Sequence, residues 1–155
     1  MKKNPIILIL LFHFIFIQTG YSQIIKPAKF TFTTNKTTPK VGETIELTFT
    51  ATIDKDWKLY SVENHLNPGP IPIEAVFNES DTFELVGKLK AIKPQKHFDS
   101  YWKGQVSYFI HKAIFIQKVK IKKAKAIIEG KLKYQTCTLK DGSCVLGKDK
   151  FGFSF

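Results

Sequence analysis

The alternation of apolar and polar residues along short segments is the feature that most constrains this chain. The clearest case is Thr44–Ile53, whose apolar residues share one face of an extended strand: Ile45, Leu47, Phe49 and Ala51. A period of two places successive side chains on opposite faces of a sheet. No window of useful length beyond the first 22 residues shows a helical period. We therefore predict an all-β fold.

Segments with this pattern follow one another along the chain and are separated by turn signals rich in Gly, Pro, Asn and Asp. The segment Lys93–Trp102 is expected to be a loop. The strands that the pattern predicts are Ala28–Thr33, Thr44–Ile53, Trp57–Tyr60, Ile73–Asn78, Thr82–Lys90, Gln105–Ile110, Ala113–Ile121, Ala126–Tyr134 and a last one that includes Phe151–Phe155. Eight or nine short strands predict one domain with an immunoglobulin-like antiparallel β-sandwich fold.

Residues 1–22 have the pattern of a secretory signal peptide. Two lysines precede the apolar run Ile6–Ile17, and small residues lie just before Gln23, where cleavage is expected. The apolar run is short for a membrane span, so cleavage is favoured over a retained anchor. We therefore expect residues 23–155 to form an exported domain in the periplasm that is not embedded in the membrane after signal cleavage.

The chain is strongly basic, with a formal net charge of +11 that falls to +9 without the two lysines of the predicted signal peptide. Basic domains often bind nucleic acid. Here the densest lysines alternate with Val119 and Ile121, as on the solvated face of a half-buried strand. The chain also contains no arginine for bidentate contacts to bases or phosphates. We expect no nucleic-acid partner.

Two cysteines, Cys137 and Cys144, lie on either side of the turn signal Asp141-Gly142. Alternating segments flank them, so the two thiols should face each other at the tip of a hairpin, within the distance that a disulfide bridges. Outside the cytoplasm such a pair is expected to be oxidised. The spacing alone leaves a structural staple and a redox-active pair as equal alternatives.

The other motifs give little support for a metal or a cofactor. Three histidines, His65, His97 and His111, are far apart in the sequence, and the cysteine spacing is wider than in a zinc knuckle. A site built from both cysteines and two histidines stays open as a minor alternative. Nothing resembles a nucleotide-binding or nucleophile motif. We expect no bound metal and no cofactor.

Aromatic residues crowd the predicted loop Lys93–Trp102, which carries Phe98, Tyr101 and Trp102 around Asp99. Packing in the core is the ordinary role of such rings. Three rings in an otherwise polar loop are harder to bury together, and a loop of this kind could fold over the cysteine hairpin. A covered disulfide is protected from stray thiols until a partner displaces the cover.

Several segments of the chain together resemble a known family of exported domains, and they cover most of the chain beyond residue 22. The segments are Asp56–Ser61, Gly69–Pro72, Glu84–Lys88, Val106–Phe109, Ala113–Ile121 and Tyr134–Cys137 with Cys144. The family is the N-terminal periplasmic domain of the bacterial thiol-disulfide interchange protein DsbD. Two differences stand out: the spacer between the cysteines is one residue longer than the family pattern, and Val145-Leu146 replace the prolines that commonly follow the second cysteine.

The resemblance implies an immunoglobulin-like fold and a redox-active pair, Cys137 and Cys144. It implies electron transfer from a membrane donor to thioredoxin-like periplasmic partners. The chain is expected to lack the membrane segment and the C-terminal thioredoxin-like domain of the whole DsbD protein, so another protein would reduce it. Whether such a protein-disulfide oxidoreductase-type exchange domain is itself an enzyme stays open. The alternative function is a secreted immunoglobulin-like binding module with a purely structural disulfide.

The resemblance also implies roles for residues around the disulfide. Residues 98–102 would match a cap loop, with Phe98 or Tyr101 as the shielding ring and Asp99 in the same loop. Tyr60 lies on the strand expected to flank the site. By the same resemblance, a partner thiolate would attack the sulfur of Cys137.

Overall fold

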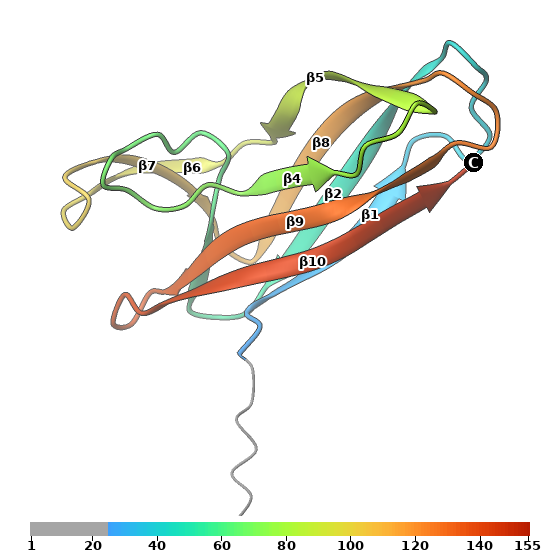
Figure 1. Ribbon diagram of the computed structural model, residues 1–155. Coiled ribbons are helices and arrows are strands. Elements are labelled where there is room, and N and C mark those ends of the chain that lie inside the picture. Colours follow the sequence, from blue (N-terminus) through green and yellow to red (C-terminus); the bar gives the residue numbers. More distant parts are fainter. Residues whose placement is uncertain (1–24) are drawn as a thin grey trace, which may run out of the picture.

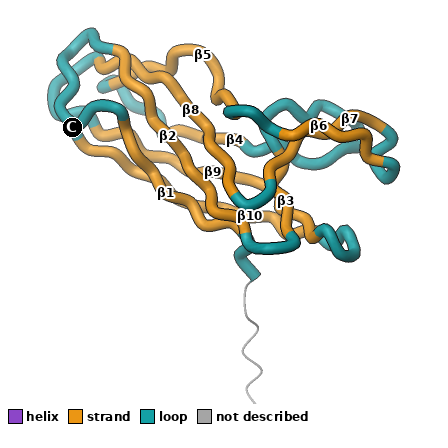
Figure 2. Tube along the Cα trace, turned by 180° about the vertical axis from the view of Figure 1, so that it is seen from behind, coloured by secondary structure: helices purple, strands orange, loops and turns teal. Residues whose placement is uncertain are grey.

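The computed structural model describes residues 25–155, so the predicted signal peptide lies outside the described residues. Strands joined by turns and loops make up this part of the chain (Figures 1 and 2). Residues 25–155 contain no helix, and therefore none that is long and apolar enough to span a membrane.

Ten strands form two antiparallel sheets in the described part of the chain. The four-stranded sheet has the order β1-β2-β8-β5, and the larger sheet has the order β10-β9-β3-β7-β6, with β4 also paired to β9. The strands are β1 (Ala28–Thr34), β2 (Thr44–Ile53), β3 (Trp57–Tyr60), β4 (Glu74–Phe77), β5 (Phe83–Ala91), β6 (Gln95–Asp99), β7 (Gly104–Phe109), β8 (Lys112–Ile121), β9 (Ile127–Thr138) and β10 (Cys144–Ser154).

The main core lies between the two sheets and is built by the alternation that predicted the strands. In β2 the apolar face is buried throughout, and in β8 Val119 and Ile121 are buried while Lys118 and Lys120 face solvent. The larger sheet contributes buried residues mainly from β9 and β10, among them Ile128, Leu132, Tyr134, Phe151 and Phe153. The predicted immunoglobulin-like β-sandwich is confirmed.

Aromatic rings fill much of this core. Phe151 of β10 lies 5.0 Å, centroid to centroid, from both Phe49 of β2 and Phe77 of β4. Gly130 of β9 pairs with Phe151 and leaves room for its ring, because a Cβ at Gly130 would lie 2.5 Å from the ring and 2.3 Å from the Val76 carbonyl oxygen. Such ring packing ties β10, and with it the cysteine hairpin, to both sheets.

The predicted strands correspond to observed ones, but the expected loop Lys93–Trp102 is wrong in part. Gln95–Asp99 is the strand β6, which pairs with Gly104–Tyr108 of β7 in a hairpin. Its residues are mostly exposed, so an alternating apolar pattern is absent. The strand exists because it adds backbone hydrogen bonds to the edge of a sheet that is already formed.

The turns of two hairpins meet at one end of the domain. The β6–β7 turn and the β9–β10 turn lie at this end, whereas the C-terminus lies at the opposite end (Figure 1). The long β3–β4 connection, residues 61–73, runs beside β7 at the same end and is called the arching loop below.

Candidate functional site

The disulfide between Cys137 and Cys144 closes the β9–β10 hairpin. The two residues are directly paired across the strands, with their Cα atoms 4.1 Å apart. The turn between them uses Gly142 at a φ of 75°, and the Asp141 carboxylate accepts a hydrogen bond from the Ser143 backbone N–H at 2.9 Å. A positive φ favours glycine. The predicted hairpin and facing thiols are confirmed, and Val145-Leu146 continue β10.

The disulfide lies on the outer face of the larger sheet, away from the main core. Along β9, Leu132 and Tyr134 point into the core, so by alternation Gln135 and Cys137 point to the other face. There Cys137 belongs to a second cluster of buried residues, the outer cluster. It contains Tyr60, Val106 and Cys137, with Leu66, Trp102 and Tyr108 packed against them.

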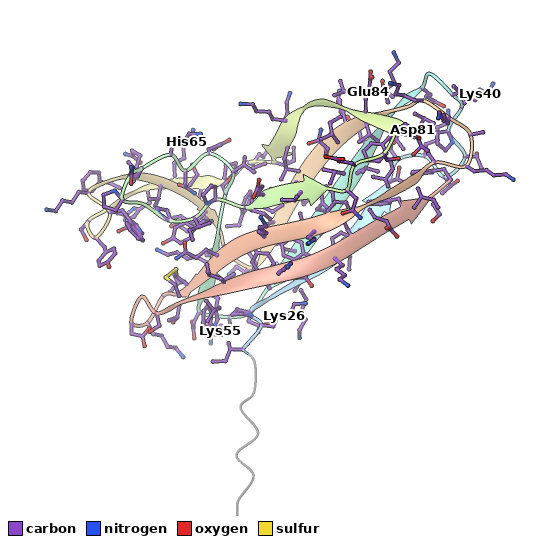
Figure 3. The ribbon with its side chains drawn as sticks, in the orientation of Figure 1. Lys26, Lys40, Lys55, His65, Asp81 and Glu84 are labelled. Atoms are coloured by element: carbon purple, nitrogen blue, oxygen red, sulfur yellow. A yellow bond between two sulfur atoms is a disulfide. The ribbon has the colours of Figure 1, made fainter. Side chains whose placement is uncertain are left out.

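The two sulfur-bearing residues differ in exposure. Cys137 is 1% exposed, whereas Cys144 is exposed. Figure 3 shows the sulfur atoms in yellow near the tip of the β9–β10 hairpin. This asymmetry is the reverse of what attack on Cys137 requires, because an attacking thiolate needs access to the sulfur that it attacks.

A cleft of about 530 Å³ opens beside the disulfide. Three elements form its walls: β3, the end of the β6–β7 hairpin, and the β9–β10 hairpin with its turn. The lining residues are Lys58, Tyr60, Asp99, Tyr101, Trp102, Gln135, Cys137, Asp141, Gly142, Ser143 and Cys144. The cleft is therefore open beside both sulfur-bearing residues.

An ion pair crosses the outer face of the sheet. The Lys58 ammonium lies 3.4 Å from Asp99 Oδ2, and it also lies 5.1 Å and 5.6 Å from the ring centroids of Tyr60 and Tyr108. The other oxygen of Asp99 accepts hydrogen bonds from the backbone N–H groups of Tyr101 and Trp102, at 2.9 and 3.2 Å. Asp99 thus fixes the β6–β7 turn and ties it to β3.

These contacts set the charge states of the pair. Burial would lower the pKa of Lys58, but its contacts with Tyr60 and Asp99 together raise the pKa above the ordinary value. Burial would raise the pKa of Asp99, but the N–H of Trp102, the Lys58 ammonium and the N–H of Tyr101 together lower it. Both groups are therefore ionised at neutral pH.

The arching loop is fastened over β7 by Asn64. Its amide nitrogen donates to the carbonyl oxygens of Ser61 and Ser107, at 3.1 and 2.7 Å, and its amide oxygen accepts the Ser107 N–H at 2.7 Å. The Leu66 side chain packs against Gly104, where a Cβ would lie 2.7 Å from it. These contacts position Leu66 in the outer cluster beside Cys137.

Gln135 links the arching loop to the disulfide. Its side-chain oxygen accepts the Ile71 backbone N–H at 2.6 Å, which orients the amide so that its nitrogen points to the Cys137 sulfur, 3.6 Å away. A donor at a sulfur stabilises negative charge on it. Gln135 is 8% exposed, so this contact is largely shielded from water.

The structure brings most of the predicted site residues together. Tyr60 is buried in the outer cluster and lines the cleft, as do Asp99 and Tyr101, the latter 81% exposed. Phe98 lies on β6, is 57% exposed and is not among the residues that line the cleft. Cys144 stays exposed beside the Tyr101–Trp102 ring pair, whose centroids lie 4.8 Å apart.

Sequence reasoning did not single out Lys58 or Gln135. The signal for Lys58 was the alternation of β3, which puts it on the face of Tyr60, and Lys58 pairs directly with Cys137. Gln135 shares a face with Cys137 for the same reason. The four-ligand metal site weighed above is not formed, since no three His, Cys, Asp or Glu side chains of residues 25–155 converge as metal ligands. His65, for example, lies on the arching loop (Figure 3).

Known proteins share this architecture. The family model described as "Thiol:disulfide interchange protein DsbD, N-terminal" matches residues 22–153. The reduced DsbD N-terminal domain of Neisseria meningitidis is similar in structure, with 16% identity, a TM-score of 0.51, and 74% of this chain and 79% of that chain covered. A comparison with curated protein sequences finds no match.

Two further solved structures are similar. The N-terminal periplasmic domain of ScsB from Proteus mirabilis has 16% identity and a TM-score of 0.59, with 87% of this chain and 50% of that chain covered. The complex between the DsbD N-terminal and PilB N-terminal domains from Neisseria meningitidis has 15% identity and a TM-score of 0.48, with 86% and 88% covered.

Proposed function

The chain belongs to the family of N-terminal domains of the thiol:disulfide interchange protein DsbD, and from this premise we propose that it exchanges electrons with partner proteins through its Cys137–Cys144 disulfide. One observation carries the assignment to this pair. A disulfide with one exposed and one buried cysteine lies at an open cleft of about 530 Å³ at the end of the domain. Such a disulfide is accessible to a partner thiolate.

We assign the first attack to the sulfur of Cys144. A thiolate approaches a disulfide along the line of the S–S bond, so the outer sulfur is attacked and the inner sulfur leaves. Cys137 is the inner residue here. The partner sulfur bonds to Cys144, the Cys137–Cys144 bond breaks, and its electron pair remains on Cys137 as a thiolate. A second thiol of the partner then releases Cys144, which leaves this chain with two thiols and the partner oxidised.

The same steps in reverse pass the electrons on, and the acceptor that fits them is a thioredoxin-like protein whose two cysteines form a disulfide. We further propose a membrane-bound dithiol protein as the electron donor, residues 1–22 as a cleaved signal peptide, and the periplasm as the location of residues 23–155. The resemblance of the sequence to exported domains supports these assignments. Amino-terminal sequencing of the protein recovered from a periplasmic extract tests the cleavage before Gln23.

Single-cysteine variants test the exchange and its direction. Each variant is activated as a mixed disulfide with thionitrobenzoate and mixed with a reduced thioredoxin that keeps only its attacking cysteine. Cys137→Ser, which retains the exposed Cys144, is expected to form the covalent adduct rapidly. Cys144→Ser, which retains the buried Cys137, is expected to react much more slowly. Faster reaction of Cys144→Ser would reverse the assignment.

A redox titration separates exchange from the structural alternative. A binding module with a purely structural disulfide predicts a reduction potential below about −300 mV and no exchange with thioredoxin-like proteins. The exchange function predicts a higher potential and equilibration with such a protein. Failure to equilibrate would leave the disulfide as a staple at the tip of a binding domain.

A further inference from the structure

Reduction of the disulfide creates a negative charge on a sulfur that is buried from water. Attack on Cys144 transfers the electron pair of the broken bond to the sulfur of Cys137, which is 1% exposed. Burial in apolar surroundings disfavours a thiolate and raises the pKa of a thiol. The negative charge on a buried leaving sulfur therefore needs a cation or a hydrogen-bond donor close by.

Lys58 is the cation placed to stabilise a negative charge on the Cys137 sulfur. It pairs directly with Cys137 across β3 and β9, so both side chains project from the same face, and both line the cleft. Its side chain is 16% exposed, and the ammonium lies over the rings of Tyr60 and Tyr108. An ammonium held in a partly desolvated cleft acts more strongly on a neighbouring charge than one in water.

We propose that the Lys58 ammonium, which lies over the rings of Tyr60 and Tyr108, and the Gln135 amide stabilise the thiolate that leaves from Cys137. This inference rests on the exchange function proposed above. In the oxidised protein the charge of Lys58 is balanced by Asp99, 3.4 Å away. When the thiolate forms, the ammonium has a second anion on the same face, and the Gln135 amide nitrogen already points to that sulfur at 3.6 Å.

The other titratable groups of the cleft do not supply a cation. They are Tyr60, Asp99, Tyr101 and Asp141, whose phenol and carboxyl groups have no positively charged form. Tyr108, beneath the ammonium, is also a phenol. Because Asp99 and Asp141 are carboxylates, loss of the Lys58 charge would leave no cation among the residues that line the cleft to offset the forming thiolate.

The thiol pKa of Cys137 is the direct test. In a Cys144→Ser background Cys137 is the only thiol of the chain, and its ionisation is followed by the ultraviolet absorbance of the thiolate. Lys58→Met, which retains the apolar stem, is expected to raise this pKa by about one unit, a tenfold change in the ionisation constant. Lys58→Arg retains the charge and is expected to raise the pKa much less.

Asp99→Asn distinguishes electrostatics from a structural role. The asparagine oxygen still accepts the backbone N–H groups of Tyr101 and Trp102, so the turn is kept while the negative charge is removed. Here the pKa of Cys137 is expected to fall, opposite in sign to Lys58→Met. If the pair only fastened the turn, both variants would shift the pKa in the same direction, and that result would overturn the proposal.

Reduction by dithiothreitol gives a second readout with both cysteines present. Lys58→Met is expected to slow it by about threefold to tenfold, since a leaving thiol of higher pKa leaves more slowly. The matched control is Lys140→Met, because Lys140 lies in the β9–β10 turn but its side chain is 74% exposed and paired with Asp56. Its removal is expected to change the rate by less than about twofold.

The outcomes separate the two proposals. If the unsubstituted protein does not exchange with reduced thioredoxin, the proposed function fails. If it does exchange, but Lys58→Met changes neither the thiol pKa nor the rate, or changes them no more than Lys140→Met, only the role of Lys58 fails. Should Lys58→Met not fold, Lys58→Gln removes the same charge, and the sign of the Asp99→Asn shift still decides.

Discussion

The Asn64 side chain should be among the polar groups that contribute most to stability near the site. It is 4% exposed and makes three hydrogen bonds: two with the backbone of Ser107 fasten the arching loop to β7, and one with the Ser61 carbonyl lies within the loop. β3 ends at Tyr60, so beyond that point the Asn64 amide takes the place of a neighbouring strand along β7. Asn64→Ala therefore removes the amide group that pairs with the backbone N–H and carbonyl of Ser107.

The loss in free energy of unfolding can be estimated from the hydrogen-bonding groups that Asn64→Ala leaves without a partner. Each lost hydrogen bond weakens the native state by roughly 0.5–1.5 kcal/mol, and a buried N–H without a partner, here that of Ser107, costs about 1–3 kcal/mol. These contributions overlap, so the free energy of unfolding is expected to fall by about 3 kcal/mol. For a domain of this size that corresponds to a decrease in Tm of about 10 °C.

Urea and thermal unfolding, followed by circular dichroism of the oxidised protein, measure this change. The matched control is Asn35→Ala, because Asn35 accepts one hydrogen bond, from the Glu46 N–H at 2.9 Å, at an exposed position. The control should lose less than about 1 kcal/mol. If both variants lose the same stability, the Asn64 bonds do not fasten the arching loop as argued.

Three further predictions concern the hairpin and the ion pair. Gly147→Ala should destabilise the domain by about 1–3 kcal/mol in urea unfolding, because the new Cβ would lie 2.1 Å from the buried Tyr134 ring; an unchanged midpoint would contradict this packing. Replacing both Cys137 and Cys144 by serine should cost at most about 2.5 kcal/mol, since the closed loop is short and the strands are already paired; failure to fold would contradict it. The folded protein lowers the pKa of Asp99, so the ionised Asp99 stabilises the fold above pH 3.8 and this stabilisation is lost as the pH falls below that value. Tryptophan fluorescence should report this loss as a transition in the acid range. The transition should be absent in Asp99→Asn.

The strands could be predicted because their signal is local. In β2 and β8 the alternation of apolar and polar residues along the sequence matches the alternation of buried and more exposed side chains. The predicted bounds of β2 match the observed ones. β6 lacked that signal because its residues are mostly exposed. It forms through pairing with β7, a contact that no short window of sequence contains.

The position of the disulfide was predictable from the turn signal and the flanking alternation, but its asymmetry was not. Cys137 is buried because Leu66, from the arching loop, and Trp102, from the β6–β7 turn, pack on the same cluster. Both come from segments distant in sequence. The attack assigned to Cys137 by resemblance therefore conflicts with a burial that only the folded chain reveals.

The difference in exposure between Cys137 and Cys144 favours an exchange site over a structural staple. A staple needs only two sulfurs in bonding geometry, and its stability does not depend on which sulfur would carry a charge. Here the exposed cysteine lines the cleft, while an amide nitrogen points to the sulfur of the buried one and Lys58 pairs with that residue across β3 and β9. Donors arranged at one sulfur stabilise the thiolate of the reduced protein more than the disulfide of the oxidised one. They are therefore expected to raise the reduction potential of the disulfide, which is the opposite of what a permanent crosslink requires.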